Sequence, residues 1–584
     1  MPSSSSRIRT RRSRAHRYGA LFGAVLLPVA FLAGTAAPAS ANAPGNPGTP
    51  SAPTILYTED FENNTAGTPE LLSAYTGAAP LNETYTADPA WVSSALCDGY
   101  IVSEQDPATP PAGSGCGASG WAGAQELSEV LGSWGDGDAA TNHALVGYTQ
   151  GNPGAGTELE TAVPIPLPAA NRFLVLGTDA AAQNCQATHP LYQLYLLNGS
   201  AAQPSFSTPI DPCASHGEIV NGTDVGTYVG DQAVLYPDTS AGIQLVNEQP
   251  SGAGNDAAVD NVRLLDVTPQ LDLSGPAGAV PVGAPANLTF TVTNTSELDA
   301  KNGWSFTAAL PTGLTQANSS VAATCASGTA TAGSPTGTLQ VSGNLSAGQA
   351  SCTVTVQVTS ILGGSYTLCA AQTTNLIGLD PPGCATLTFT APVFDARSDS
   401  ALLTSPILNL GPLAPASYQC TTAAGSNSNS AVSAGLGTVG NLGALTSSAA
   451  GTIAADGTRT ASAGNQTAGL NLLTGLITAD VVSTNAQAQQ PLTTSGPGTV
   501  TVSGSTTFTN LRIGGTAIAA NPGPNTTISL PLVGSVVLNQ QTTIAGGDGI
   551  TVNALHVTLL TGTQLTIATS TSALLSATAT CPVS

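Results

Sequence analysis

Apolar and hydroxyl side chains alternate along the middle of the chain. The runs LTFTVT (288–293) and CTVTVQVT (352–359) place an apolar residue at every second position. A period of two is typical of strands that are buried on one face, because successive side chains point to opposite faces of a sheet. Several short strands of this kind predict an immunoglobulin-like sandwich over residues 269–392.

The segments on either side are also rich in strand-like runs. From 54 to 267 the runs are longer, loop insertions separate them, and one short helix is expected at 123–132. This pattern predicts a two-sheet, jelly-roll-like sandwich. From 394 to 584 apolar residues recur even through the Ser-, Ala- and Gly-rich stretch 421–470, which we interpret as meandering strands. The expected fold class is therefore all-β.

The N-terminus has the pattern of an export signal. Six arginines precede an apolar run at 20–36, and small residues follow it. We predict that residues 1–43 are a secretory signal peptide and that 44–53 form a Pro/Gly linker. The alternative is a membrane anchor, which Pro28 disfavours. We find no second membrane-spanning stretch and no sorting signal. We therefore expect a secreted protein, and we expect any association with the cell wall to be non-covalent.

Composition narrows the classes of function. Charged residues make up only 8% of the chain, with 34 acidic and 12 basic side chains. Six of the basic residues lie in the first 17 positions, so the remainder has a net charge of −28. We expect no nucleic-acid partner, because phosphate contacts need lysine and arginine. So acidic a surface repels anionic polymers and bilayers, and it attracts divalent cations.

Ten cysteines, an even number, are typical of a disulfide-bonded exported protein. They fall into three groups, one for each predicted domain. Sequential pairing is the simplest expectation: Cys97–Cys116, Cys185–Cys213, Cys325–Cys352, Cys369–Cys384 and Cys420–Cys581. Other connectivities stay open, because sequence alone does not decide among them.

Acidic side chains gather at the two ends of the first domain. Asp60 and Glu62 follow its first predicted strand, and Asp256 and Asp260 begin its last. In jelly rolls these two strands commonly pair antiparallel, which would bring the carboxylates together. Calcium takes about six to eight oxygen ligands. We therefore expect a structural calcium ion with Glu62 and Asp260 as its first candidate ligands and Asp60 and Asp256 as the second. The alternative is a solvated acidic rim.

Two tryptophans and one lysine could in principle bind a ligand or form a cross-link. Trp121 and Trp134 lie in Gly-rich insertions, where an exposed ring could stack on a sugar. They are the candidate ligand-binding residues, and core packing is the alternative. Lys301, the only lysine, stands beside a predicted turn, and we expect it to be solvated.

Nothing in the sequence indicates catalysis. GxSxG is absent, and no GxGxxG follows a strand and opens a helix. A glycosidase needs two carboxylates about 5–10 Å apart, but chance pairs are common in so acidic a domain. We therefore expect a protein that is not an enzyme and has no catalytic residues.

Two segments resemble known families. NLTFTVTNTS and the LPTGL turn resemble the prokaryotic surface-protein repeat called "domain of unknown function eleven". The C-terminal segment is similar to the choice-of-anchor P family, through FDARSDSALLTSPILNLGPLAPAS, ITADVVST, GSTTFTNLRIGGTAIAANPGPNTTISLP, VVLNQQT and GDGITVNALHVTLL. The resemblance implies a secreted actinobacterial envelope protein. That family carries variable C-terminal anchors, and this sequence departs from it by showing none.

These observations together predict a structural or adhesive component of the cell envelope or extracellular matrix. Its partners would be cell-wall or extracellular glycan, or other envelope proteins. The first alternative is a carbohydrate-binding protein that acts through the first domain, and a glycoside-active enzyme comes third.

Overall fold

The computed structural model describes residues 46–65, 67–135, 138–333, 337–546 and 548–579. The expected signal peptide lies outside these residues. Strands dominate the described chain, and its only helices are one α-helix and two short 3-10 helices, Ala370–Gln372 and Gly437–Val439. The all-β expectation is confirmed. Among the described residues, no helix is long and apolar enough to cross a bilayer.

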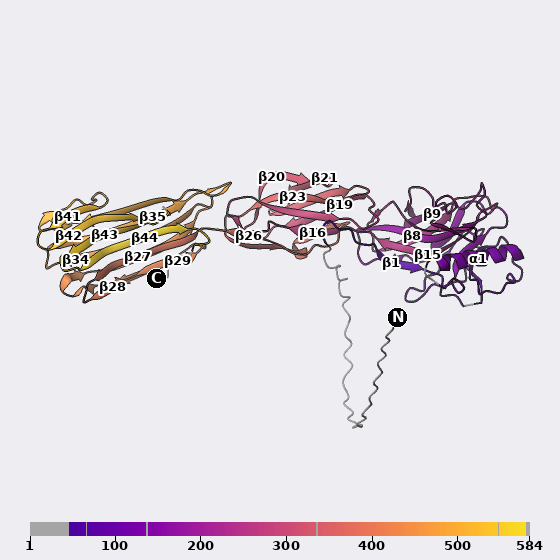
Figure 1. The fold of residues 1–584 in the computed structure, drawn as a ribbon, viewed down its shortest axis with the longest axis horizontal. Coiled ribbons are helices and arrows are strands. Elements are labelled where there is room, and N and C mark those ends of the chain that lie inside the picture. The colour runs from indigo at the N-terminus through magenta and orange to yellow at the C-terminus, as the bar shows by residue number, and fades with distance from the viewer. Residues whose placement is uncertain (1–45, 66, 136–137, 334–336, 547, 580–584) are drawn as a thin grey trace, which may run out of the picture. The chain divides into compact units, whose positions relative to one another are not determined.

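The first segment is a sandwich of two sheets (Figure 1). The larger sheet has the order β11-β12-β8-β15-β5-β4-β2, with β1 on β15 and β13 on β8. Its strands are β1 Thr54–Glu59, β2 Glu70–Leu71, β4 Asp98–Val102, β5 Ala144–Tyr148, β8 Arg172–Gln183, β11 Glu218–Val220, β12 Thr223–Val229, β13 Val234–Tyr236 and β15 Asp256–Asp266. The smaller sheet has the order β10-β9-β14-β6-β3, with β7 on β14. Its strands are β3 Tyr85–Thr86, β6 Gly156–Thr161, β7 Ile165–Pro166, β9 Tyr192–Asn198, β10 Ala201–Pro204 and β14 Ser240–Asn247.

Apolar residues fill the space between these two sheets, and a second cluster fills the space under the helix. Leu145 of β5 and Leu194 of β9 belong to the core between the sheets. Helix α1, Ala118–Trp134, covers the other face of the larger sheet through Leu127 and Leu131. The helix is longer than the expected 123–132, because its apolar positions continue backward to Trp121 at helical spacing.

The middle segment contains three sheets. The four-stranded sheet β16-β18-β23-β20 consists of Gln270–Ser274, Ala286–Thr293, Ser351–Thr359 and Thr315–Ala323. The sheet β21-β22-β19-β25 consists of Ala326–Ala332, Thr338–Leu345, Lys301–Ala309 and Thr373–Ile377. The small sheet β17-β26-β24 consists of Val280–Pro281, Ala385–Thr390 and Gly364–Leu368. Alternating residues of β18 and β23 are buried, as the period of two predicts.

One residue of the middle segment departs from its expected place. Lys301 begins β19 and is fully buried, so the expectation of a solvated lysine is wrong. Its ammonium group lies 2.5 Å from Glu297 Oε1 and donates to the Asp299 carbonyl at 3.3 Å. The alternation of β19 turns this side chain inward, and the carboxylate supplies the opposite charge that a buried lysine needs.

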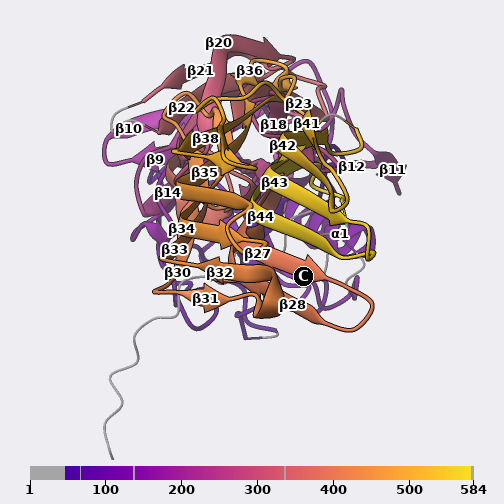
Figure 2. The ribbon, with the colours of Figure 1, turned by 90° about the vertical axis from the view of Figure 1, so that its left-hand side faces the viewer.

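The C-terminal segment is a second two-sheet sandwich, whose layers lie side by side in Figure 2. One sheet has the order β28-β27-β44-β43-β42-β41, with β29 on β27. Its strands are β27 Val393–Thr404, β28 Asn409–Leu413, β29 Ala416–Thr421, β41 Thr526–Leu530, β42 Gly534–Thr543, β43 Gly549–Leu559 and β44 Gln564–Leu575.

The other sheet has the order β30-β33-β34-β35-β39-β40, with β38 on β35. Its strands are β30 Gly425–Ala431, β31 Ala434–Gly435, β32 Gly440–Leu442, β33 Leu445–Ile453, β34 Arg459–Leu472, β35 Ile477–Gln490, β38 Thr501–Thr509, β39 Arg512–Ile513 and β40 Thr516–Ala517. A separate hairpin pairs β36 Leu492–Thr493 with β37 Gly496–Pro497. The stretch 421–470 therefore consists largely of strands, as expected.

Candidate functional sites

The first and last strands of the first sandwich pair antiparallel, as the calcium hypothesis requires. Glu59 at the end of β1 is in register with Val262 of β15. Beyond this pair, β15 has a register shift between Asp260 and Arg263, and Asn261 takes a positive φ of 49°. The irregularity turns Asp260 into the protein, where it is only 1% exposed.

Glu62 and Asp260 lie close together, but their carboxylate oxygens already interact with neighbouring groups. Glu62 accepts a hydrogen bond from the backbone N–H of His143 at 2.6 Å, and its other oxygen lies 3.0 Å from His143 Nδ1. Asp260 accepts from Asn142 Nδ2 at 3.0 Å and from the Asn261 N–H at 2.6 Å. Burial, followed by the nearby charges of Asp179 and Glu62, raises the pKa of Asp260 to about 8.

The other two expected ligands lie elsewhere. Asp60 is exposed and accepts from the Glu62 N–H at 3.2 Å. Asp256 accepts from Asn184 Nδ2 at 2.8 Å. Four residues along a strand separate Asp256 from Asp260 by about 13 Å, too far to share an ion whose bonds are about 2.3–2.6 Å long. The prediction that Glu62, Asp260, Asp60 and Asp256 form one set of ligands is therefore wrong.

The two candidate tryptophans do not form a shared exposed surface for a sugar either. Trp121 is fully buried on α1, where its ring meets Tyr100 edge-on and its Nε1 donates to the Pro107 carbonyl at 2.9 Å. Trp134 is half-buried at the end of the same helix and donates to Thr227 Oγ1 at 2.9 Å. The Gly-rich insertion that suggested exposure is a helix, and its apolar side packs on the sheet. Trp121 is thus a core residue, and the expectation of an exposed ring is wrong for it.

Cysteine pairing follows the chain as expected wherever both partners are described. The bonds Cys97–Cys116, Cys185–Cys213, Cys325–Cys352 and Cys369–Cys384 are all present. Cys581 lies outside the described residues, so its bond to Cys420 stays a prediction.

Within the described part of the chain, three metal-ligating side chains converge at one place: Cys185, Cys213 and Asp224. The two sulfurs are bonded to each other and are not thiolates, which are the form of cysteine that binds metals. This group is therefore not a metal centre.

Sequence reasoning did not predict that several acids of the first sandwich are buried. Glu59 is 4% exposed and accepts from the hydroxyl groups of Tyr75, at 2.8 Å, and Tyr85. Asp98 and Glu158 are buried between the sheets. Glu59 stands beside Asp60 and Glu62 and Glu158 stands near Glu160 in the sequence, so their neighbours gave no sign that these two side chains are buried.

The C-terminal sandwich presents aliphatic side chains at one end. We call the exposed set the apolar loop end: it consists of Ile407, Leu408, Val432, Leu532 and Leu560. Ile407 is 95% exposed, Leu532 96% and Leu560 78%. Backbone contacts join the loops, since the Leu560 N–H donates to the Val533 carbonyl at 2.9 Å. This end lies at the far ends of the strands from the Val393–Leu575 pair.

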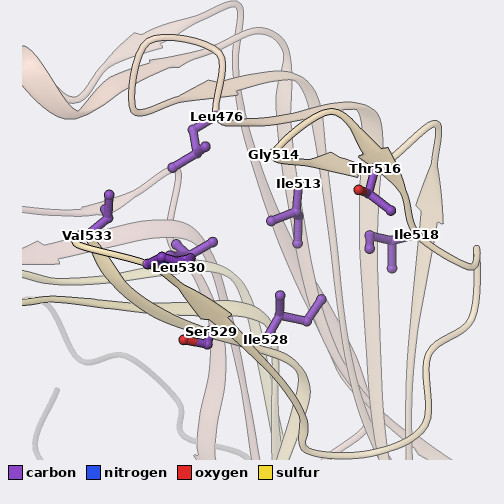
Figure 3. A pocket seen from close by; sticks show the side chains of 10 residues that line it. Leu476, Ile513, Gly514, Thr516, Ile518, Ile528, Ser529, Leu530 and Val533 are labelled. Carbon is purple, nitrogen blue, oxygen red and sulfur yellow. The ribbon is translucent and has the colours of Figure 1, made fainter.

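A groove of about 330 Å³ opens beside these loops (Figure 3). It lies between β41 of one sheet and the β39–β40 hairpin of the other, so both layers contribute to its walls. Aliphatic side chains from the two sides point toward one another across it: Leu476, Ile513, Ile518, Ile528, Leu530 and Val533. The loop end thus combines exposed aliphatic tips with an apolar hollow.

Comparison with protein families bears on the middle segment. A family model described as a domain of unknown function, DUF7933, matches residues 270–389, which span β16 to β26. A search of curated proteins finds no match to the chain. The resemblances to the "domain of unknown function eleven" repeat and to the choice-of-anchor P family therefore stay predictions.

Proposed function

We propose that this chain is a non-catalytic structural or adhesive protein of the cell exterior, and that it docks on another envelope protein through the apolar loop end. The main evidence is a set of five solvent-exposed aliphatic side chains beside an apolar groove. Contiguous exposed apolar surface of this kind marks interaction sites in soluble proteins.

The cystines support an extracellular setting. Disulfides persist in oxidising compartments, and four are present among the described residues. The export signal expected at 1–43 agrees with this location.

The chemistry of the loops favours a protein partner over a glycan or a bilayer. The loops 405–408, 431–433, 473–476, 531–533 and 560–563 contain no aromatic and no charged residue. Sugars stack on aromatic rings, and interfacial membrane binding draws on aromatic and basic side chains. Aliphatic tips instead suit an apolar face on another protein, as in the core of a protein–protein interface.

The test is co-sedimentation of the purified full chain with isolated cell envelopes. The triple variant Ile407→Ser, Leu532→Ser and Leu560→Ser removes the most exposed tips. We expect it to weaken binding by about tenfold or more, since each buried aliphatic side chain contributes about 1.5–3 kcal/mol. The matched control changes Val163→Ser and Ile219→Ser, exposed aliphatic residues of the first sandwich, and should bind like the wild type.

Protease treatment of the envelopes identifies the partner class. We expect binding to disappear from treated envelopes. Binding that survives this treatment, or that the triple variant retains in full, would contradict the proposal. For the carbohydrate-binding alternative, the burial of Trp121 leaves the half-buried Trp134 as the remaining candidate ring.

A further inference from the structure

Asp98 is a buried carboxylate with nothing to neutralise it. It begins β4 and is fully buried, and among the described residues neither of its oxygens has a partner in hydrogen-bond geometry, although the nearby Thr149 hydroxyl lowers its pKa. The preceding residue, Cys97, is tied to Cys116, so the start of this strand is held in place. An isolated carboxylate in such a position is costly, because burial removes its hydration without replacement.

The side chain points into the space between the two sheets. Asp98 is in register with Gly147 of β5, and a Cβ placed on that glycine would lie 3.3 Å from Asp98 Oδ1 and 3.8 Å from Thr149 Oγ1. Leu145, two residues before Gly147, belongs to the core between the sheets. Alternation along β5 puts Gly147 and Thr149 on that same side.

A second carboxylate comes from the opposite sheet. Glu158 is the extra residue at a register shift of β6, since its neighbours Leu159 and Thr157 pair with Leu245 and Val246. It is 5% exposed, and Asn247 Nδ2 donates to its Oε1 at 2.8 Å. Burial, then the charge of Glu158, raises the pKa of Asp98 to about 8, and burial raises that of Glu158 to about 7.

Further oxygen atoms border the pair. Asn247 also donates to Asn255 Oδ1 at 3.0 Å, and Thr149 Oγ1 donates to the Asn255 carbonyl at 2.8 Å. The Thr149 hydroxyl also lies beside Asp98, so its oxygen is within reach of a ligand held there. Carboxylates from two sheets, with hydroxyl and amide oxygens around them, form a hard-oxygen environment of the kind that calcium prefers.

No basic side chain of the first sandwich reaches this pair. Arg172 pairs with Asp266, and Arg263 pairs with Asp179. The three histidines pair with other acids, His143 with Glu62, His189 with Asp211 and His216 with Asp224. From 54 to 267 the sequence holds no further arginine, lysine or histidine. The negative charge of the pair is therefore balanced either by protons or by a cation from solution.

We infer that a calcium ion binds between the two sheets of the first sandwich, on the carboxylates of Asp98 and Glu158, with Thr149 and Asn255 at its border. This site is distinct from the Glu62–Asp260 region and is independent of the docking function proposed above. Its role is to hold the two sheets together where the core is polar.

The test uses the purified full-length protein after removal of metals. We expect one calcium ion per chain by elemental analysis, and a higher unfolding temperature of the first sandwich in millimolar calcium than in EDTA. Terbium, which replaces calcium, should give emission sensitised by Trp91, whose ring lies beside Asp98 at Gly147. The variants Asp98→Asn and Glu158→Gln should each weaken calcium binding by more than the roughly 10–100-fold that loss of an outer-shell group costs.

Two controls locate the ion. Asp260→Asn removes another deeply buried carboxylate of the sandwich and should keep the calcium response. Trp91→Phe should lose terbium emission and keep the calcium-dependent rise in unfolding temperature. If Asp98→Asn fails to fold, the metal content and terbium emission of the wild type still decide the matter.

Three results would overturn the inference. The first is a metal-free wild type that unfolds identically in calcium and EDTA, which would mean that a proton neutralises the pair. The second is loss of the calcium response in Asp260→Asn but not in Asp98→Asn. The third is equal stabilisation by magnesium and calcium at the same concentration.

Discussion

At the scale of single residues, the first sandwich and the middle segment bury two charged side chains, one expected to be solvated and the other to bind calcium. Lys301 and Asp260 are both almost completely buried. Lys301 has Glu297 as its counter-ion, whereas Asp260 is held by amide groups of Asn142 and Asn261. A buried acid without a basic partner makes stability depend on pH, since folding changes its affinity for protons.

Asp260 should make the protein less stable as pH rises. Its pKa is about 8 in the folded protein against an ordinary value of 3.8, so between these values the folded state binds more protons than the unfolded state. The free energy of unfolding therefore falls with rising pH across this window. Asp260→Asn removes the titrating group, and we expect a flatter profile and a higher unfolding temperature at pH 8 than the wild type.

The measurement is thermal unfolding from pH 5 to 9 at a fixed calcium concentration. A shift of one pKa unit corresponds to about 1.4 kcal/mol, so even a partial shift is measurable. Asp60→Asn, at an exposed carboxylate, is the matched control and should keep the wild-type slope. Identical slopes for Asp260→Asn and the wild type would refute the assignment.

At the scale of elements, α1 owes its place on the larger sheet to close packing as much as to its apolar stripe. Gly132 lies inside this helix and is buried. A Cβ there would come within 2.5 Å of Asn142 Cβ and 3.1 Å of the Ala139 Cα, which are fixed to the backbone. The missing side chain is what lets the helix approach the loop before β5.

Gly132→Ala should therefore destabilise the first sandwich. Alanine is favoured over glycine in a helix by about 1 kcal/mol, but overpacking typically costs about 1–3 kcal/mol, and here neither contact can move without the backbone. We expect a lower unfolding temperature by calorimetry. Gly117→Ser is the control: Gly117 is the extended N-cap residue with open space around it, and serine caps helices well. A stabilised Gly132→Ala variant would show that the helix shifts freely.

At the scale of the whole molecule, each sheet takes its strands from one segment of the chain. Each described disulfide also joins two cysteines of the same segment. In the C-terminal sandwich, β29 and β44 flank β27: Phe394 pairs with Thr421 on one side and Leu574 on the other. Cys420 at the end of β29 thus lies two strands from the end of β44, about 10 Å away. Six residues reach from Leu575 to Cys581, which span up to about 20 Å.

This geometry predicts a Cys420–Cys581 bond. Closing so long a loop should stabilise the sandwich by about 5 kcal/mol in the chain-entropy model. Peptide mapping without reduction should recover the two cysteines linked, and Cys581→Ser should lower the unfolding temperature of the C-terminal sandwich only. Recovery of Cys581 as a free thiol in protein purified without reductant would disprove the bond.

The sequence by itself determined the features that depend on residues close together along the chain, namely the strands and the four described disulfides. The alternation in runs such as 288–293 and 352–359 predicted strands, because the period of a strand is a local property. The four described cystines join cysteines 15 to 28 residues apart, so short loops bring the partners together.

Only the tertiary structure decided which polar side chains meet. The register shifts at Glu158 and Asp260 change the face to which each carboxylate points, and no local pattern marks them. Asp98 and Glu158 belong to different sheets, so packing of the two sheets brings them together. Trp121 likewise became a core residue once α1 lay on its sheet. Burial is a relation between segments distant in sequence, and therefore a local pattern cannot specify it.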